Sequence, residues 1–430
     1  MTETNKVRIA ILGLGTVGGG VYQLFQAQAD TLMAKTGLDA EIAAILVRDA
    51  NKPREGVALS LLTESFEDIL HDETIDIIVE VMGGIEPART YITEALKAGK
   101  NVVTANKDLM AAHGGELLDL AQEVGRDLLF EASVAGGIPI IRPMKQCLAG
   151  NRITEVMGIV NGTTNYILTK MDEEGMEFSN ALAKATELGY AEADPTADIE
   201  GYDAGRKLAI LASIAFHSRV TFSDVHTEGI SRITAADIRY VRDMGCIIKL
   251  VATARETEKG IEASVQPMLL PVHHPLASVK DVFNAVFVHG DAVGDTMFYG
   301  RGAGRFPTAS ACMGDIIDVM RNIRFYCTGR IGCGCYRHVP IQPMEETIQR
   351  YFLRMQVVDR PGVLASIASV MGKYGVSIKQ VVQKPTEEGR AELVLITDQV
   401  QEKDFLKALE KFRSMTNMIQ EISSVIRVYE

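Results

Sequence analysis

Several features that would assign this protein to a class at once are scarce in its sequence. Six cysteines in 430 residues are too few for a disulfide framework. No apolar run is long enough to span a bilayer, and a formal net charge of −12 argues against nucleic acid and anionic membranes as main partners. Residues 7–12 already have the pattern of a strand, so we expect no signal peptide. The sequence therefore predicts a cytoplasmic globular protein with two or three domains.

Three of the cysteines, Cys327, Cys333 and Cys335, lie close together in the sequence. A zinc site would need a fourth ligand such as His338, and the spacing matches no common zinc pattern. Free thiols in a connecting segment are the favoured interpretation.

A glycine-rich motif follows the first predicted strand. Residues 7–12 are mostly apolar, as in a strand buried in a parallel sheet, and they lead into Gly13-Leu14-Gly15-Thr16-Val17-Gly18. In a dinucleotide-binding motif the first glycine allows a tight turn, the second lets a pyrophosphate approach, and the third lets the following helix pack closely. The alternative is a plain glycine-rich turn. The position of the motif between a strand and a helical pattern favours a Rossmann-type domain.

The end of the second predicted strand, residues 41–47, bears on the choice of cofactor. An NAD-selective domain usually has an acid at this position, which binds the ribose hydroxyls. Here Arg48 precedes Asp49, and Lys52 and Arg54 follow. Since an arginine can pair with a 2′-phosphate, we expect NADP to be preferred, with NAD possible through Asp49.

Further polar residues follow later strands of the predicted sheet. Residues 75–82 and 101–104 have strand patterns, and the second leads into Thr104-Ala105-Asn106-Lys107. Ligands bind at the carboxyl edge of open α/β sheets, so Thr104 and Lys107 are candidates, although Lys107 could be an ordinary surface lysine. Residues 128–134 are a further predicted strand, in which Glu131 is an acid that requires a partner.

The stretch at residues 189–207 contains the largest group of candidate catalytic side chains. It contains Glu192, Asp194, Asp198, Asp203 and Lys207 between a glycine turn and an apolar helix. Pro195 marks the loop, and the helix is expected to begin near residue 200. Asp203 and Lys207 are four residues apart and therefore share one helix face, where they could be either a surface ion pair or a site that moves a proton.

The last eighty residues form a separate pattern. Strands are predicted near residues 351–357, 376–382, 391–396 and 422–428, with helices after residue 362 and at residues 401–412. This β-α-β-β-α-β order is the ferredoxin-like arrangement. The run Asp359-Arg360-Pro361-Gly362-Val363-Leu364 resembles the signature turn of ACT domains, which bind amino acids at subunit interfaces.

The chain as a whole resembles the homoserine dehydrogenases. The resemblance rests on the spacing of Ala185, Gly189, Asp194-Pro195, Asp198, Gly201, Asp203 and Lys207, and on Ala105-Asn106-Lys107, Asn161-Gly162-Thr163-Thr164-Asn165 and Tyr299-Gly300-Arg301-Gly302-Ala303-Gly304. It implies reversible oxidation of L-homoserine to L-aspartate 4-semialdehyde with NADP or NAD as the cofactor, and inhibition by an end-product amino acid, expected to be threonine.

The resemblance also implies roles for individual residues. Lys207 would move the proton and Asp203 would hold the reacting oxygen, while Glu192, Lys107 and Thr163 would bind the substrate. Cofactor contacts are implied for residues 13–18 and for Arg48, Thr104, Lys107, Gly189 and Gly304. A monovalent cation, Na or K, is implied beside Glu131 and the carbonyls of Val134, Gly136 and Ile138.

The predicted architecture has three domains. A Rossmann-like domain spans residues 1–139 and is completed by a helix near residues 305–321. An α+β substrate and dimerisation domain spans residues 140–304, a linker spans residues 322–349, and the ACT domain spans residues 350–430. We expect a homodimer or homotetramer. Two alternatives remain: a non-catalytic amino-acid sensor, and an aspartate semialdehyde dehydrogenase, which would need an activated cysteine such as Cys147.

Overall fold

The structure is a computed structural model that describes residues 6–385 and 389–429. The expectation about a signal peptide concerns residues 1–5, which lie outside the described residues. The chain forms two compact units. Unit 1 comprises Met1–Val156, Arg206–Asp224 and Phe283–Val339, and unit 2 comprises Met157–Gly205, Val225–Val282 and Pro340–Glu430. In the described ranges, no helix is both long enough and apolar enough to cross a membrane.

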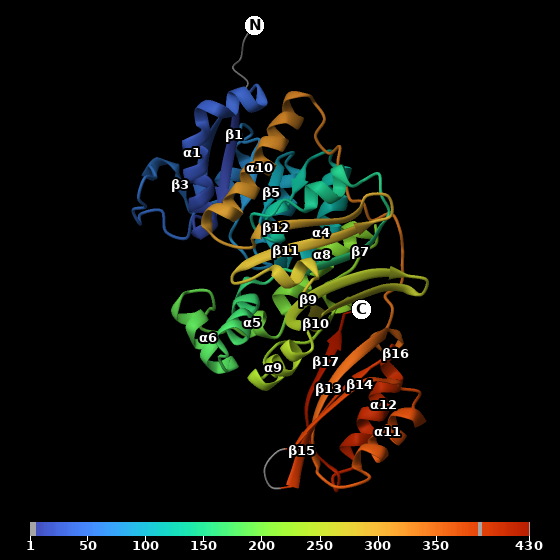
Figure 1. The fold of residues 1–430 in the computed structure, drawn as a ribbon. Helices are drawn as coiled ribbons and strands as arrows, with labels where there is room; N and C mark the ends of the chain where they lie inside the picture. The colour runs from blue at the N-terminus through green and yellow to red at the C-terminus, as the bar shows by residue number, and fades with distance from the viewer. Residues whose placement is uncertain (1–5, 386–388, 430) are drawn as a thin grey trace. The chain divides into compact units, whose positions relative to one another are not determined.

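Unit 1 contains a six-stranded parallel sheet in the order β3-β2-β1-β4-β5-β6 (Figure 1). The strands are β1 (Lys6–Leu12), β2 (Asp39–Leu46), β3 (Leu62–Thr63), β4 (Ile77–Glu80), β5 (Asn101–Thr104) and β6 (Leu128–Leu129). The connecting helices are α1 (Thr16–Thr36), α2 (Phe66–His71), α3 (Ala88–Lys97) and α4 (Lys107–Glu123). This strand order defines a doubly wound dinucleotide-binding sheet, whose strand order reverses between β1 and β4.

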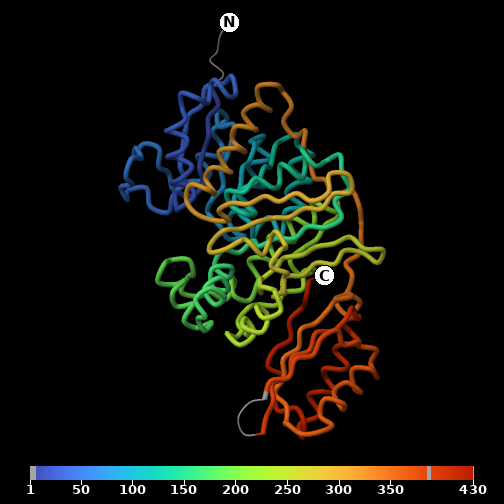
Figure 2. Tube along the Cα trace, viewed as in Figure 1, coloured from blue at the N-terminus to red at the C-terminus, as the bar shows by residue number. Residues whose placement is uncertain are grey.

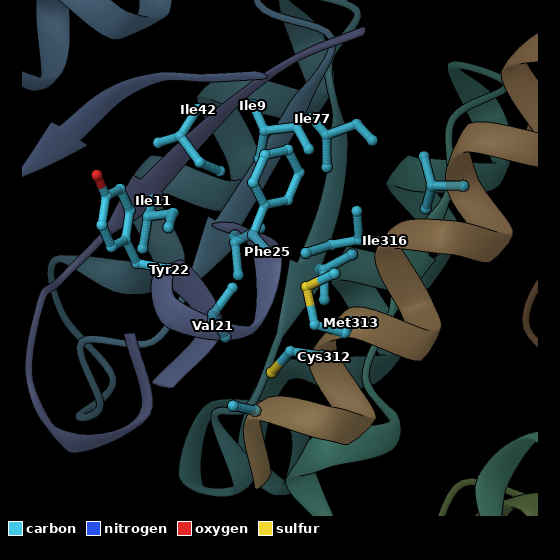
Figure 3. Packing of buried hydrophobic residues seen from close by; sticks show 14 of the residues in the cluster. Ile9, Ile11, Val21, Tyr22, Phe25, Ile42, Ile77, Cys312, Met313 and Ile316 are labelled. Carbon is cyan, nitrogen blue, oxygen red and sulfur yellow. The ribbon is translucent and has the colours of Figure 1, made fainter. Parts of the chain in front are cut away.

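A helix from much later in the chain completes the core of this sheet. The helix α10 (Arg305–Arg324) packs against α1, and the colours of Figure 2 show how far apart the two are in the sequence. A Cβ atom built on Gly20 of α1 would lie 2.8 Å from the carbonyl oxygen of Arg305, so glycine permits the close approach. Phe25, Met313 and Ile316 meet in the buried cluster between the helices and the sheet (Figure 3).

The rest of unit 1 is a hairpin and several short elements. The hairpin pairs β11 (Phe283–Gly290) with β12 (Gly294–Arg301) in antiparallel register. The short helical elements are 3-10 turns at Leu59–Leu61, Glu131–Ser133 and Phe222–Asp224 and a π-helical turn at Pro143–Cys147. Two elements, β7 (Ile153–Ile159) and α8 (Tyr202–Ala215), pass from one unit into the other.

Unit 2 joins helices and a long hairpin to the C-terminal fold. Its helices are α5 (Gly162–Glu174), α6 (Phe178–Glu187), α7 (Thr196–Ile199) and α9 (Ala235–Asp243), with 3-10 turns at Pro275–Ser278 and Met344–Glu346. The hairpin pairs β9 (Cys246–Thr257) with β10 (Gly260–Pro271), and the short β8 (His226–Thr227) pairs with β10.

The C-terminal part of unit 2 has the predicted β-α-β-β-α-β order. Its elements are β13 (Ile348–Val358), α11 (Val363–Lys373), β14 (Ile378–Pro385), β15 (Arg390–Thr397), α12 (Glu402–Arg413) and β17 (Ile419–Val428), with the short β16 (Val400–Gln401) on β13. The strand order is β17-β13-β15-β14, and both helices cover one face of the sheet (Figure 1). Since β17 also pairs in parallel with β10, the sheet continues into the β9–β10 hairpin.

One local prediction is wrong, and one short helix was not predicted. Residues 128–134 do not form one strand, because β6 ends at Leu129 and Glu131 lies in a 3-10 turn. Pro195 lies in a loop as predicted, but the short helix α7 begins directly after it, where the Asp194 side chain accepts a hydrogen bond from the Thr196 N–H at 3.1 Å. Proline ends helices but is well suited to the start of one, which the sequence pattern did not distinguish.

Candidate active site

The turn between β1 and α1 has the geometry of a phosphate-binding loop. Gly13 has a φ of 98°, which favours glycine, and its N–H donates to the carbonyl of Leu46 at 3.0 Å. A Cβ atom on Gly18 would lie 2.1 Å from the carbonyl oxygen of Gly13. By contrast, a Cβ atom on Gly15 would have no heavy atom within 4 Å. The chain therefore leaves open space at Gly15, where α1 begins and its first N–H groups can bind an anion.

Two of the polar residues after β2, Asp49 and Arg54, form hydrogen bonds within the loop that follows this strand. Arg48 is exposed and lies two residues after the last residue of the strand. The Asp49 side chain accepts a hydrogen bond from the Asn51 N–H at 2.9 Å, and Arg54 donates to the carbonyls of Asp49 and Lys52. Asp49 and Arg54 thus shape the loop.

A buried acid joins the carboxyl ends of β4 and β5. Glu80 is fully buried, and its carboxylate accepts hydrogen bonds from Thr104 Oγ1 at 2.6 Å and from the Met82 N–H at 2.8 Å. Asn106 caps α4 by accepting from the Leu109 N–H, and it donates to the carbonyl of Gly84. Glu80 was not among the residues predicted from the sequence, although an acid directly after Ile77-Ile78-Val79 was a usable signal.

Lys107 is the first residue of α4 and is half-buried. Its neighbour Asp108 forms an ion pair with Arg206 of α8 at 3.2 Å. Arg206 directly precedes Lys207 in the sequence. This ion pair therefore joins the first turn of α4 to the first part of α8.

Asp203 and Lys207 are both buried, with exposed fractions of 4% and 8%. The interpretation of these residues as a surface helix pair is therefore wrong, because surface pairs keep their charges in water. Asn161 donates to the carboxylates of Asp203 at 2.9 Å and Asp198 at 2.7 Å. The same side chain accepts from the Thr164 N–H at 2.9 Å and caps α5.

The other residues of this stretch lie at its surface or hold its turns. Thr163 is buried, and its hydroxyl donates to the carbonyl of Tyr190 at 2.8 Å. Glu192 is exposed, and Gly189, with a φ of 73°, ends α6. Hydrogen bonds from Thr196 hold the pKa of Asp194 below its usual value, so this carboxylate stabilises α7.

The carboxylate of Glu131 is hydrogen-bonded to backbone N–H groups. Its carboxylate accepts hydrogen bonds from the N–H groups of Ile140, Ile141 and Arg142 at 2.6, 2.7 and 2.8 Å. The intervening loop contains Ala135 and Gly136 at φ values of 56° and 54°. A left-handed conformation is rare for alanine and marks backbone strain of the kind found at ligand sites.

The loop that contains Val134, Gly136 and Ile138 packs on the glycine turn before α10. The Gly137 N–H donates to the carbonyl of Arg301 at 3.1 Å, and a Cβ atom on Gly136 would lie 2.3 Å from the carbonyl oxygen of Gly302. Gly304, with a φ of 118°, precedes α10. Among the described residues, no group of three or more His, Cys, Asp or Glu side chains could hold a metal ion.

The turn after β13 encloses a separate hollow of about 400 Å³. Residues 357–364 line it together with Gln383 and Leu393. Gly362 has a φ of 91° and precedes α11. The parallel sheet and the open glycine turn define a dinucleotide-binding protein, and the C-terminal β-α-β-β-α-β fold adds a separate domain with its own hollow.

Comparisons with known proteins give the family. Three family models match the chain: "Homoserine dehydrogenase, NAD binding domain" over residues 13–131, "Homoserine dehydrogenase" over residues 139–317 and "ACT domain" over residues 351–415. A homoserine dehydrogenase of Corynebacterium glutamicum is 49% identical over 99% of this chain and 96% of its own length. One of Bacillus subtilis is 45% identical over 98% of both chains. The chain belongs to the homoserine dehydrogenase family.

Solved structures agree with this assignment. The crystal structure of a homoserine dehydrogenase from Thiobacillus denitrificans has a TM-score of 0.93 at 41% identity and covers 99% of this chain and 98% of its own. A hyperthermophilic archaeal homoserine dehydrogenase in complex with NADPH has a TM-score of 0.63 at 29% identity, over 73% of this chain and 97% of its own.

Proposed function

We propose that this chain catalyses the reversible oxidation of L-homoserine to L-aspartate 4-semialdehyde, with a nicotinamide cofactor as the hydride carrier. One observation carries the proposal. A carboxylate and an ammonium group, Asp203 and Lys207, are buried four residues apart on α8, although such groups normally remain in water. Burying a carboxylate and an ammonium group costs free energy, and a site that binds a small polar substrate accounts for that cost.

The proposed chemistry divides the work between cofactor and protein. The cofactor accepts hydride from the hydroxyl carbon, and the protein holds that carbon in place. Lys207 exchanges the proton with the substrate oxygen, and Asp203, oriented by Asn161, holds that oxygen. Glu192 binds the substrate ammonium, with Lys107 and Thr163 completing the substrate contacts.

We propose NADP as the preferred cofactor, with residues 13–18 holding the pyrophosphate. Arg48 is exposed at the end of β2, where a 2′-phosphate would lie, whereas the Asp49 carboxylate already accepts a backbone hydrogen bond. The related archaeal enzyme was solved with NADPH. Thr104, Lys107, Gly189 and Gly304 complete the proposed cofactor contacts.

We also propose a monovalent cation, Na or K, at the loop of Val134, Gly136 and Ile138. Carbonyl oxygens are suitable ligands for a hard cation, and this loop turns through the left-handed conformations of Ala135 and Gly136. The Glu131 carboxylate shapes this loop through its three backbone hydrogen bonds.

Threonine is the proposed effector, and the hollow at residues 357–364 is its proposed site. Contacts within unit 2 offer a route from the ACT domain to the catalytic stretch. Arg427 of β17 forms ion pairs with Glu402, at 2.9 Å, and with Glu228. Two residues after Glu228, the Ile230 N–H donates to the carbonyl of Ile199 at 2.8 Å, close to Asp198 and Asp203 in the chain.

We further propose a cytoplasmic homodimer or homotetramer. The two alternative functions, a non-catalytic sensor and an aspartate semialdehyde dehydrogenase, differ from this proposal in what they require of the protein. A non-catalytic sensor would not turn over homoserine, and an aspartate semialdehyde dehydrogenase would need a cysteine activated by a base. Cys147 is exposed on the π-helical turn, and burial of a catalytic pair on α8 favours the homoserine reaction over both.

Replacing Lys207 by alanine tests the proposed catalytic role. We expect turnover to fall by about 10²–10⁴-fold while the affinity for NADPH stays within about threefold, because proton transfer by a positioned group contributes a factor of that size. Lys280→Ala is the matched control, since Lys280 is an exposed lysine paired with Glu173. An unchanged kcat in Lys207→Ala would contradict the assignment.

A further inference from the structure

Unit 1 contains a mostly apolar cavity of about 380 Å³ that includes none of the proposed catalytic or cofactor residues. Its walls are residues 110–118 of α4, residues of the second half of α8, and the π-helical turn at Pro143–Cys147. Residues 331–335 line another side of it. This segment contains Cys333 and Cys335, for which the proposed reaction has no use.

Hydrogen bonds fix the segment on both sides of Cys333. Lys145 Nζ donates to the carbonyl of Gly332 at 3.0 Å, and His217 Nδ1 lies 3.1 Å from the carbonyl oxygen of Gly334. Further along, the Arg337 N–H donates to the carbonyl of His217 at 2.8 Å. The two thiols are thus held at the cavity by defined contacts.

The two thiols line the same cavity and are separated in the chain by Gly334 alone. Cys335 Sγ lies 3.6 Å from the carbonyl oxygen of Ser213. The hydrogen bond with Cys335 lowers the pKa of Cys333 to about 6, with Arg219 acting in the same direction and burial and Asp119 opposing it. For Cys335 the same hydrogen bond raises the pKa. Thiolates are the reactive form of cysteine, so Cys333 has the character of an attacking group and Cys335 that of a proton-bearing partner.

We propose that Cys333 and Cys335 form a dithiol modification site that reacts with peroxides. In the first step the Cys333 sulfur attacks a peroxide oxygen, the O–O bond breaks, and Cys333 becomes a sulfenic acid as hydroxide leaves. In the second step the Cys335 sulfur attacks the Cys333 sulfur, an S–S bond forms, and water leaves with the Cys335 proton. The pair is oxidised by two electrons and one peroxide is reduced, so atoms and electrons balance.

The local sequence suits this chemistry. Gly334 separates the two cysteines, and glycine has the conformational freedom that a ring closed over a single residue requires. A metal site is the alternative use of paired thiols. Within the described residues, no cluster of three or more metal-ligating side chains includes these two.

Alkylation of the reduced full-length protein tests the nucleophile. We would treat it with iodoacetamide at pH 6 and follow each cysteine by peptide mass mapping. A thiol of pKa about 6 is half ionised there, and after correction for its lower intrinsic nucleophilicity we expect Cys333 to react about tenfold faster than an ordinary exposed thiol. Cys147 is the internal reference, because it is exposed. A rate for Cys333 equal to or below that of Cys147 would overturn the proposal.

Peroxide treatment tests the pair. We expect one equivalent of hydrogen peroxide to remove two hydrogens and to yield a peptide cross-linked between Cys333 and Cys335. In Cys335→Ser, dimedone should trap a sulfenic acid at Cys333, whereas Cys147→Ser should behave as the wild type. A peptide oxidised first at another cysteine, or a Cys333 sulfenic acid that persists in the wild type, would refute the pairing. The wild-type measurements need no variant to fold.

Discussion

Replacing Gly15 by alanine tests where the cofactor's pyrophosphate binds. Gly15 has a φ of −78°, which alanine adopts readily, and the added methyl group would meet no heavy atom of the protein within 4 Å. The substitution should therefore leave the folded protein unchanged. The same methyl group would occupy the space that the pyrophosphate needs at the start of α1.

The expected size of the effect follows from the hydrogen bonds at stake. A methyl group at this point pushes the phosphate away from the backbone N–H groups of the first turn of α1. Hydrogen bonds to charged groups contribute about 1.5–3 kcal/mol each, so losing one or two of them should weaken NADPH binding by about 10- to 10⁴-fold. The melting temperature of the protein without cofactor should change by less than about 2 °C.

The assay is NADPH binding by titration calorimetry, with a thermal melt of each variant. Gly19→Ala is the matched control, because its methyl group would meet only the side chain of Arg305. Gly18→Ala should instead fail to fold normally, since its methyl group would lie 2.1 Å from the carbonyl oxygen of Gly13. If Gly15→Ala binds NADPH as tightly as the wild type, the pyrophosphate does not lie at this turn.

Three further predictions concern cofactor choice, regulation and pH. Arg48→Ala should raise the KM for NADP at least tenfold and leave that for NAD within about twofold, because only NADP has a 2′-phosphate; an equal change in both KM values would exclude this role. Asp359→Ala should raise the threonine concentration for half-inhibition at least tenfold, whereas Asp404→Ala on the exposed face of α12 should not; equal inhibition of both variants would place the effector elsewhere. Burial lowers the pKa of Lys249 to about 8, so the folded state loses its proton before the unfolded state does, and stability should rise by about 1 kcal/mol between pH 8 and pH 9. Lys249→Met should lack this rise in urea unfolding, and an identical pH dependence in both proteins would contradict the lowered pKa.

The local features of the fold were predictable because they depend on neighbouring residues. The strand, glycine turn and helix at residues 6–36 follow from a short apolar run and from where glycine is needed. The Asn161 cap of α5 follows from the preference of helix starts for asparagine. The C-terminal order of strands and helices follows from alternation and turn residues in the same way.

Features that depend on distant residues were not predictable. No local pattern indicates that Asn161 also binds the carboxylates of Asp198 and Asp203, because the partners are brought together only by the fold. Glu131 was predicted in a strand because its neighbours are apolar, but its carboxylate caps the backbone at residues 140–142 instead. The ion pair of Arg427 with Glu228 joins residues almost two hundred positions apart, for which a single sequence contains no signal.

Homoserine oxidation by the purified full-length chain tests the central claim most directly. The measurement follows nicotinamide absorbance with NADP and NAD separately, with and without threonine. We predict turnover that depends on homoserine, is faster with NADP and falls when threonine is added. No turnover with either cofactor, in a protein that still binds NADPH, would contradict the account and favour a non-catalytic amino-acid sensor.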